Sequence, residues 1–160
     1  MKKNQKGFSL IELLIVVAII LIIAAIAIPN LLRARMAANE SSAVGSVRTI
    51  NTAEISYFTT YGTGFAPLAS LGGATPCAAA AATACLIDDT LAQGVKSGYT
   101  MATPGVAAGT ASAPTVAYTV TAVPVAIGQS GQRGFFSDQS GVIRYNLTGA
   151  APTVADLPLQ

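Results

Sequence analysis

The chain has 160 residues, of which 52% are apolar and only 10% charged, well below the roughly 25% of charged residues in an average soluble domain. Its formal charge of +2 depends on Lys2, Lys3 and Lys6, because the remaining residues carry six basic and seven acidic side chains. This balance predicts no basic surface for nucleic acid. The chain has no histidine, which excludes Ser-His-Asp and Cys-His catalytic arrangements and removes a common zinc ligand. We therefore predict no enzymatic activity, no cofactor and no metal site.

The longest apolar segment covers residues 8–28, interrupted only by Ser9 and Glu12. As a helix it spans roughly 31 Å, about the thickness of the hydrocarbon core of a bilayer. The three lysines precede this segment, so the positive-inside rule leaves the N-terminus in the cytoplasm and exports the rest of the chain.

Three interpretations of this apolar segment remain open from the residues alone. It is a plain membrane anchor, a secretory signal peptide cut after Ala27, or a segment that anchors first and assembles later. The Ala25-Ile26-Ala27 sequence has the form of a signal-peptide cleavage site. Glu12 helps to distinguish these interpretations. A carboxylate one turn inside an apolar helix either extends back to the membrane surface or is available to pair with a cation from another molecule.

Residues 6–13, with the sequence KGFSLIEL, resemble the recognition sequence of type IV pilins and type II secretion pseudopilins. The resemblance implies that a prepilin peptidase cuts after Gly7 on the cytoplasmic side and then N-methylates Phe8. It assigns Glu12 to the fifth position of the mature chain. It also matches Pro29 to a proline that recurs near the end of the apolar segment in this family.

The chemistry of the predicted new N-terminus suggests a role for Glu12. Cleavage before Phe8 frees an α-amine, and methylation keeps its positive charge. Phe8 and Glu12 lie on the same face of a helix, but an ammonium group at this place opposes the positive end of the helix dipole. A Glu12 carboxylate from an adjacent subunit can relieve this opposition. We expect that pair to fix the register of identical subunits in a helical filament.

The resemblance also implies partners and a location. The subunit is stored in the bilayer of the bacterial inner membrane with its head in the periplasm. An assembly platform with an ATPase then builds it into a homo-oligomeric filament, either an extracellular type IV pilus or the periplasmic pseudopilus of type II secretion. Two other classes of protein remain as alternatives. One is a secreted soluble binding protein with an ordinary signal peptide, and the other is an anchored domain that never polymerises.

Helix is expected to continue beyond the apolar segment. Pro29 removes a backbone hydrogen bond, so we predict a kink or local melting there. Residues 30–64 then have the pattern of an amphipathic helix that packs on a soluble core, and Gly62 and Gly64 predict its end. Glu54 falls within the apolar stripe and has no explanation from the pattern. The predicted stripe comprises Val44, Val47, Ile50, Ile55, Tyr57, Phe58 and Tyr61.

Residues 65–97 have little periodicity and predict a connecting region. Cys77 and Cys85 lie within it, and in an exported domain we expect them to form a disulfide, the alternative being two free thiols. Asp88 and Asp89 are too few to predict a calcium site, so structural or solvated roles are expected.

Four strands are predicted, at residues 98–103, 115–123, 132–137 and 142–147, with a hairpin turn at 138–141. Consecutive short strands indicate an antiparallel sheet, and residues 148–160 indicate an irregular tail. The predicted fold class is α+β, a long N-terminal helix packed on a small antiparallel sheet. The predicted organisation is a cleaved leader (1–7), a transmembrane and filament-core helix (8–29), an amphipathic helix (30–64) and an exported head (65–160).

Overall fold

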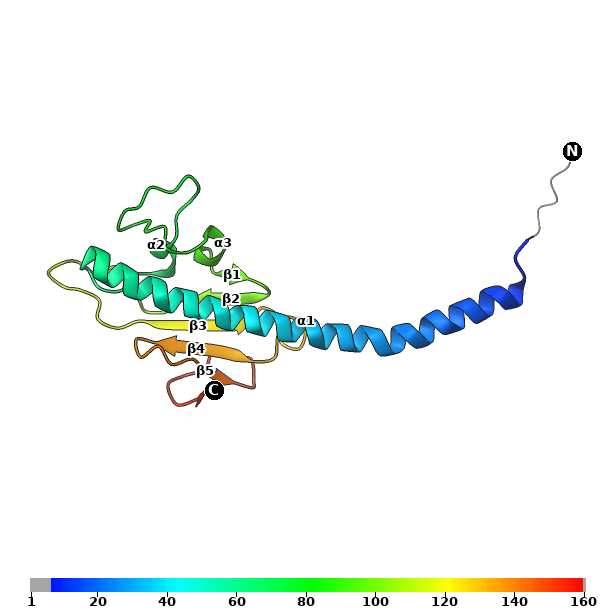
Figure 1. Cartoon of the computed structure of the whole chain (residues 1–160). Helices are drawn as coiled ribbons and strands as arrows, with labels where there is room; N and C mark the ends of the chain where they lie inside the picture. The colour runs from blue at the N-terminus through cyan, green and yellow to red at the C-terminus, as the bar shows by residue number, and fades with distance from the viewer. Residues whose placement is uncertain (1–6, 160) are drawn as a thin grey trace, which may run out of the picture. The chain divides into compact units, whose positions relative to one another are not determined.

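The computed structural model describes residues 7–159 and has α+β architecture (Figure 1). The chain divides into two compact units between Arg35 and Met36, and α1 passes through both. Within the described residues the helices are α1 (Leu10–Tyr61), α2 (Leu68–Leu71) and α3 (Asp89–Ala92). The strands are β1 (Val95–Lys96), β2 (Tyr99–Ala102), β3 (Thr119–Pro124), β4 (Gly134–Asp138), β5 (Arg144–Asn146) and β6 (Leu157–Pro158).

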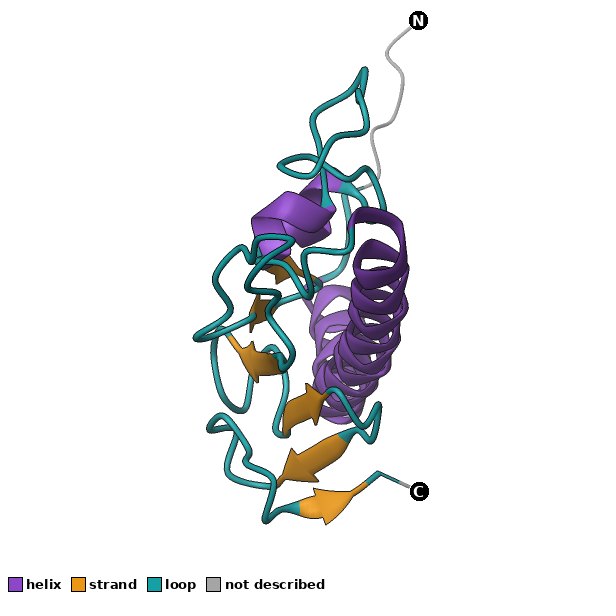
Figure 2. Ribbon diagram, turned by 90° about the vertical axis from the view of Figure 1, so that its left-hand side faces the viewer, coloured by secondary structure: helices purple, strands orange, loops and turns teal. Residues whose placement is uncertain are grey.

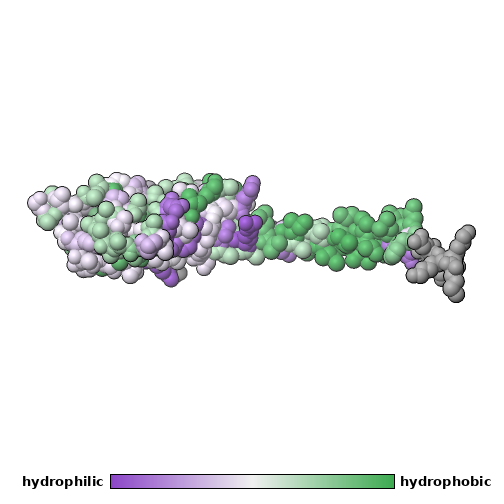
Figure 3. Space-filling view, turned by 90° about the horizontal axis from the view of Figure 1, so that it is seen from above, coloured by the Kyte–Doolittle hydropathy of each residue, from purple (hydrophilic) through white to green (hydrophobic). Residues whose placement is uncertain are grey.

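The N-terminal unit is the apolar part of α1. Its most apolar 18-residue window has a mean hydropathy of 3.3, and none of that window is buried. By length and composition this helix can cross a membrane. Its surface is coloured as hydrophobic in Figure 3. The helix continues through Pro29, so the backbone is not melted there, whereas the kink stays a prediction.

The C-terminal unit contains an antiparallel sheet in which the strands follow their chain order, β1-β2-β3-β4-β5-β6. The four predicted strands are confirmed as β2 to β5, with shifted ends. The predicted turn is also confirmed, because the Gly141 N–H donates to the Asp138 carbonyl over 2.9 Å. The prediction of an irregular tail is wrong at residues 157–158, which form β6 and pair with β5. This short strand depends on its partner and has no local pattern of its own.

Residues 36–61 of α1 lie along one face of the sheet (Figure 2). Asn51 fixes the two layers relative to each other, since its Nδ2 donates to Ser137 Oγ over 2.8 Å and its Oδ1 accepts from the Tyr118 hydroxyl over 3.2 Å. Fully buried sheet side chains such as Val120 and Phe135 complete the core. The buried α1 residues are Glu40, Ala43, Ser46, Val47, Ile50, Asn51, Ala53, Glu54 and Tyr57.

The predicted stripe is wrong at two positions. Ile55 is 59% exposed and Phe58 is 39% exposed. At about 100° per residue, Ile55 is rotated by roughly 140° from Ile50, which places it outside the buried face. Val47, Ile50 and Tyr57 are buried as predicted.

The end of α1 and the disulfide follow the sequence predictions. α1 ends at Tyr61, and Gly62 adopts a left-handed conformation (φ +65°) from which its N–H donates to the Phe58 carbonyl over 3.1 Å. Cys77 and Cys85 are joined in a disulfide with their Cα atoms 6.1 Å apart. This bond closes an exposed loop within the connecting region.

Candidate functional site

The start of α1 forms a compact hydrogen-bonded arrangement. Residues 7–9 are non-helical and exposed, and the helix begins at Leu10. The Glu12 Oε2 atom accepts a hydrogen bond from the Ser9 backbone N–H over 2.9 Å. The Ser9 carbonyl in turn accepts from the Leu13 N–H over 3.2 Å. Ser9 therefore occupies the N-cap position and Glu12 the third helical position, as in a capping box.

This cap gives Glu12 a role that our sequence analysis did not predict. The carboxylate satisfies an N–H group near the helix N-terminus and places negative charge at the positive end of the helix dipole. The Ser-x-x-Glu spacing is the sequence signal that could have shown it. In the uncut chain the nitrogen of Phe8 is a peptide nitrogen, so the predicted ammonium partner of Glu12 does not yet exist.

The predicted cleavage site lies beside this cap. Gly7 and Phe8 precede the helix, and the Phe8 side chain is 84% exposed. Exposed, non-helical backbone of this kind is readily bound by a peptidase. Lys2, Lys3 and Lys6 of the predicted leader lie outside the described residues.

The apolar side chains that follow the cap are exposed over many turns. An apolar surface of this length requires a cover of lipid or of other protein. The most exposed of them, each at least 60% accessible, are Leu10, Ile11, Leu13, Leu21, Ile22, Ile23, Ile26, Ile28 and Leu31.

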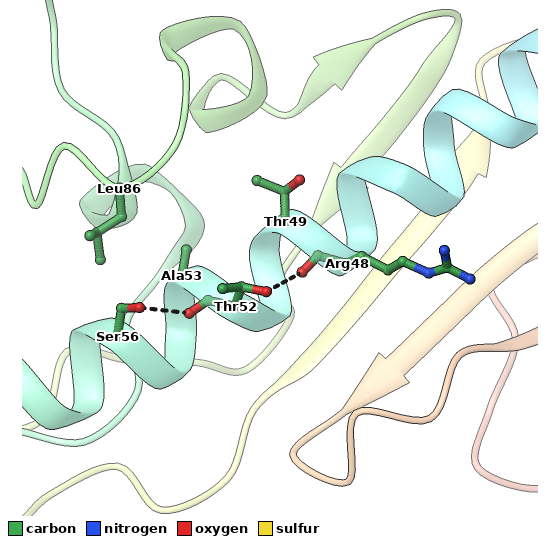
Figure 4. A pocket seen from close by; sticks show the side chains of 6 residues that line it. All are labelled: Arg48, Thr49, Thr52, Ala53, Ser56 and Leu86. Carbon is green, nitrogen blue, oxygen red and sulfur yellow. Dashed lines mark hydrogen bonds between the residues drawn. The ribbon is translucent and has the colours of Figure 1, made fainter.

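A second candidate surface is a shallow hollow on the exposed side of α1 in the C-terminal unit (Figure 4). Its hydroxyl groups already donate to the helix backbone: Thr49 to Gly45, Thr52 to Arg48 and Ser56 to Thr52, each over 3.0 Å. They are therefore committed to α1 and offer little to a polar ligand.

The Asp88 carboxylate has a structural role, as predicted. It caps α3 by accepting from the Leu91 N–H over 2.9 Å, and its other oxygen lies 2.8 Å from the Lys96 ammonium group. Hydrogen bonds from Lys96 and from the Thr90 hydroxyl lower the pKa of Asp88 to about 2. Among residues 7–159 no group of three histidine, cysteine or acidic side chains is placed to hold a metal ion.

Glu40 ties α1 to the loop between β3 and β4. One of its oxygens accepts from the Gln132 and Arg133 N–H groups over 2.9 and 3.1 Å, and the other lies 2.7 Å from Arg133 Nε. Burial opposes ionisation of this carboxyl group, but these hydrogen bonds outweigh it and hold the pKa of Glu40 below its usual value.

Glu54, unexplained by the sequence pattern, is fully buried. Its Oε2 accepts from the Ala66 N–H over 3.0 Å, which ties α1 to the segment that follows it. Its Oε1 has no hydrogen-bond partner among the described residues. Burial raises the pKa of Glu54 to about 7, although the hydrogen bond from Ala66 acts in the opposite direction.

Comparison with known proteins bears on the first of these sites. A family model described as the prokaryotic N-terminal methylation motif matches residues 2–28. The chain is 67% identical over 39 residues to the type IV wide pilus major component PilA4 of Thermus thermophilus, a match covering 24% of this chain and 30% of that protein. It is 47% identical over 55 residues to the type IV major pilin protein PilA of Myxococcus xanthus, covering 34% of this chain and 25% of that protein.

No solved structure gives a significant match. The matched regions span less than a third of each relative's length, so the similarity concerns the N-terminal segment. That segment contains the Gly7-Phe8 bond, the Glu12 cap and the exposed apolar helix. The N-terminal segment of this chain is therefore similar to the corresponding segment of these type IV pilins.

Proposed function

We propose that the chain is the structural subunit of a type IV pilus-like filament. A prepilin peptidase processes it, the inner membrane stores it, and it polymerises through its N-terminal helix. The observation that carries this proposal is the start of α1, where a single carboxylate, Glu12, caps an apolar segment that has no other charged residue before Arg33 and no buried residue in its most apolar 18-residue window.

The backbone around the two candidate cleavage sites favours prepilin processing over a signal peptide. The Gly7-Phe8 bond lies in exposed, non-helical chain, whereas Ala25-Ile26-Ala27 lies inside α1. A peptidase reaches the first bond without unwinding the helix. Cutting there removes the leader (residues 1–7) and leaves residues 8–29 as membrane anchor and later filament core.

Storage in the inner membrane is supported by the apolar part of α1, because its backbone groups are paired internally and its side chains are apolar. The proposed orientation places the leader in the cytoplasm and the C-terminal unit in the periplasm, where the disulfide between Cys77 and Cys85 persists. Lipid tails are as apolar as leucine, so the helices have no hydrophobic drive to associate within the bilayer. Extraction is therefore assigned to an assembly platform powered by an ATPase.

Assembly is proposed to exchange the partner of Glu12. Cleavage creates an ammonium group at Phe8, and the Glu12 carboxylate of a neighbouring copy is its counter-ion. The bond to the Ser9 N–H lies at the exposed end of the helix, so Glu12 can be released without disturbing the head. Both named relatives are pilus components, which favours an extracellular pilus over the pseudopilus of type II secretion.

Two measurements test this proposal. Mass spectrometry of protein from sheared filaments is expected to give an N-terminal peptide that begins at N-methylated Phe8. A peptide that begins at Ile28 would instead show signal-peptide cleavage and a soluble exported protein.

Filament yield tests Glu12 separately. Glu12→Gln keeps an oxygen that accepts from the Ser9 N–H but removes the charge, whereas Glu12→Ala removes both. We expect both variants to insert in membranes and to lose filament yield at least tenfold, because the charge is what the neighbouring ammonium requires. Full yield from Glu12→Gln with loss only in Glu12→Ala would show that the cap matters and that the intersubunit pair does not.

A further inference from the structure

Two arginines follow the apolar part of α1 within the N-terminal unit. Arg33 and Arg35 are both exposed, and neither forms an ion pair with any residue among 7–159. They are the first basic residues after the leader lysines, with no basic residue between. Their guanidinium groups are therefore available to an anionic partner outside this chain.

Their distance along the helix fits the thickness of a bilayer. At 1.5 Å per residue, Arg33 lies roughly 35 Å and Arg35 roughly 38 Å from Leu10. A hydrocarbon core is about 30 Å thick, and the bilayer is about 40–45 Å thick with its headgroups. With the start of α1 at the cytoplasmic boundary, both guanidinium groups therefore reach the headgroups of the outer leaflet.

Their positions around the helix indicate what kind of partner binds them. Residues two apart on a helix are rotated by about 200°, so Arg33 and Arg35 extend to nearly opposite sides. A protein that docks on one side of the helix reaches only one of them, whereas lipid surrounds the helix and reaches both. Guanidinium groups bind phosphate with two parallel hydrogen bonds, which suits the phosphates of lipid headgroups.

We propose that Arg33 and Arg35 bind lipid phosphates of the outer leaflet and act as a one-way stop on the stored subunit. This inference rests on the proposed storage of the helix in the inner membrane. Displacement toward the cytoplasm drags two cations into hydrocarbon, which is unfavourable. Displacement toward the periplasm carries them into water. The stop thus resists inward slip and leaves outward extraction free.

Processing makes this stop more important. Cleavage after Gly7 removes Lys2, Lys3 and Lys6 with the leader. The mature helix then retains one ammonium group at its cytoplasmic end, and the two arginines hold its periplasmic end. Outward extraction no longer requires three lysines to cross the bilayer.

Phosphate contact is tested directly by solid-state NMR. The full chain, labelled with 13C at the arginine guanidinium carbons, is reconstituted at high dilution in phosphatidylethanolamine and phosphatidylglycerol vesicles in a buffer free of phosphate. We expect 31P dephasing of the arginine signal in the wild type and at least a threefold loss in R33Q/R35Q. Arg48→Gln, an exposed arginine further along α1, is the matched control and is expected to keep the wild-type signal. Equal dephasing in R33Q/R35Q and the wild type overturns the inference.

The stop itself is tested by depth. The chain has no tryptophan, so Leu31→Trp introduces a single tryptophan beside the arginines, whose fluorescence is excited selectively at wavelengths that tyrosine does not absorb. Adding R33Q/R35Q is expected to increase quenching by lipids brominated at mid-chain at least twofold, because the segment sinks. Unchanged quenching overturns the one-way stop.

Flotation of the same samples separates failure of the inference from failure of the proposed function. A chain that floats with the vesicles but shows no phosphate contact contradicts the arginine inference alone. A chain that does not float contradicts membrane storage as well. The near-UV circular dichroism of the tyrosines checks that the head is folded in every variant.

Discussion

The buried carboxyl group of Glu54 makes the stability of the head depend on pH. Its side chain is fully buried, and one carboxyl oxygen has no hydrogen-bond partner within residues 7–159. Burial raises the pKa of Glu54 from 4.5 to about 7. Between these values the folded chain keeps the proton and the unfolded chain releases it. The contribution of Glu54 is therefore fully present below pH 4.5 and is lost as pH rises toward 7.

The magnitude follows from the size of the shift. Each pKa unit corresponds to about 1.4 kcal/mol, so the free energy of unfolding falls by roughly 3 kcal/mol between pH 4.5 and pH 7. Few other groups obscure this window. The chain has no histidine, and the pKa of Glu40 is lowered, which places its titration below the window. The pKa of the nearby Tyr118 hydroxyl is raised to about 12, far above it.

The assay is urea unfolding of the full chain in mild detergent, followed by the near-UV circular dichroism of the tyrosines at several pH values. The wild type is expected to lose stability as pH rises from 4.5 to 7. Glu54→Gln is expected to be less stable at low pH, since its buried amide lacks a partner, but to show little pH dependence. The reasoning is refuted if both proteins show the same slope.

Three further changes probe the head, each followed by urea unfolding. Glu40→Gln is expected to lower the free energy of unfolding by roughly 2 kcal/mol at pH 7, because it weakens the charge-assisted hydrogen bonds with the Arg133 side chain and backbone. The variant is also expected to lose less stability than the wild type on acidification below pH 4.5. An equal loss of stability in both proteins below pH 4.5 would contradict the ion pair. Replacing Cys77 and Cys85 by serine is expected to cost about 2–3 kcal/mol for a loop of this length, and thiol titration of the unreduced wild type should find no free cysteine. Phe135→Ala is expected to cost about 3–5 kcal/mol, since its side chain is fully buried.

The sequence could predict the elements that have a strong local pattern. The apolar segment and the glycine after Tyr61 defined the long helix. The strand predicted at residues 115–123 corresponds to β3, and Tyr118, just before β3, and Val120, within it, are both buried in the core. β6 could not be predicted, because it consists of two residues held by their pairing with β5. The small helix α3 has a signal in its cap, Asp88, that is too short to predict a helix by itself.

Apolar character alone was insufficient to assign faces. Ile55 is apolar yet exposed, and Glu54 is acidic yet buried. The helical angle predicts both facts, since Glu54 is rotated by only about 40° from Ile50. The partner of Glu54 could not be predicted, because the Ala66 N–H is presented by a loop whose path depends on the folded head. Tertiary contacts of this kind leave no local signature.

The three acidic residues of α1 all accept hydrogen bonds from backbone N–H groups, but they differ in whether a new partner can take the place of that N–H group. Glu12 accepts from the Ser9 N–H, Glu40 from the N–H groups before β4, and Glu54 from the Ala66 N–H. The last two bonds join segments distant from α1 and are enclosed in the head, so breaking either one leaves a buried carboxyl group without its hydrogen-bond donor. Glu12 is exposed and holds only the first turn of its own helix. The processing proposed above brings a cation next to that turn and leaves the head intact. Of the three acids, Glu12 is therefore the one that can change partner at the lowest cost to the fold, and an intersubunit contact is best placed there.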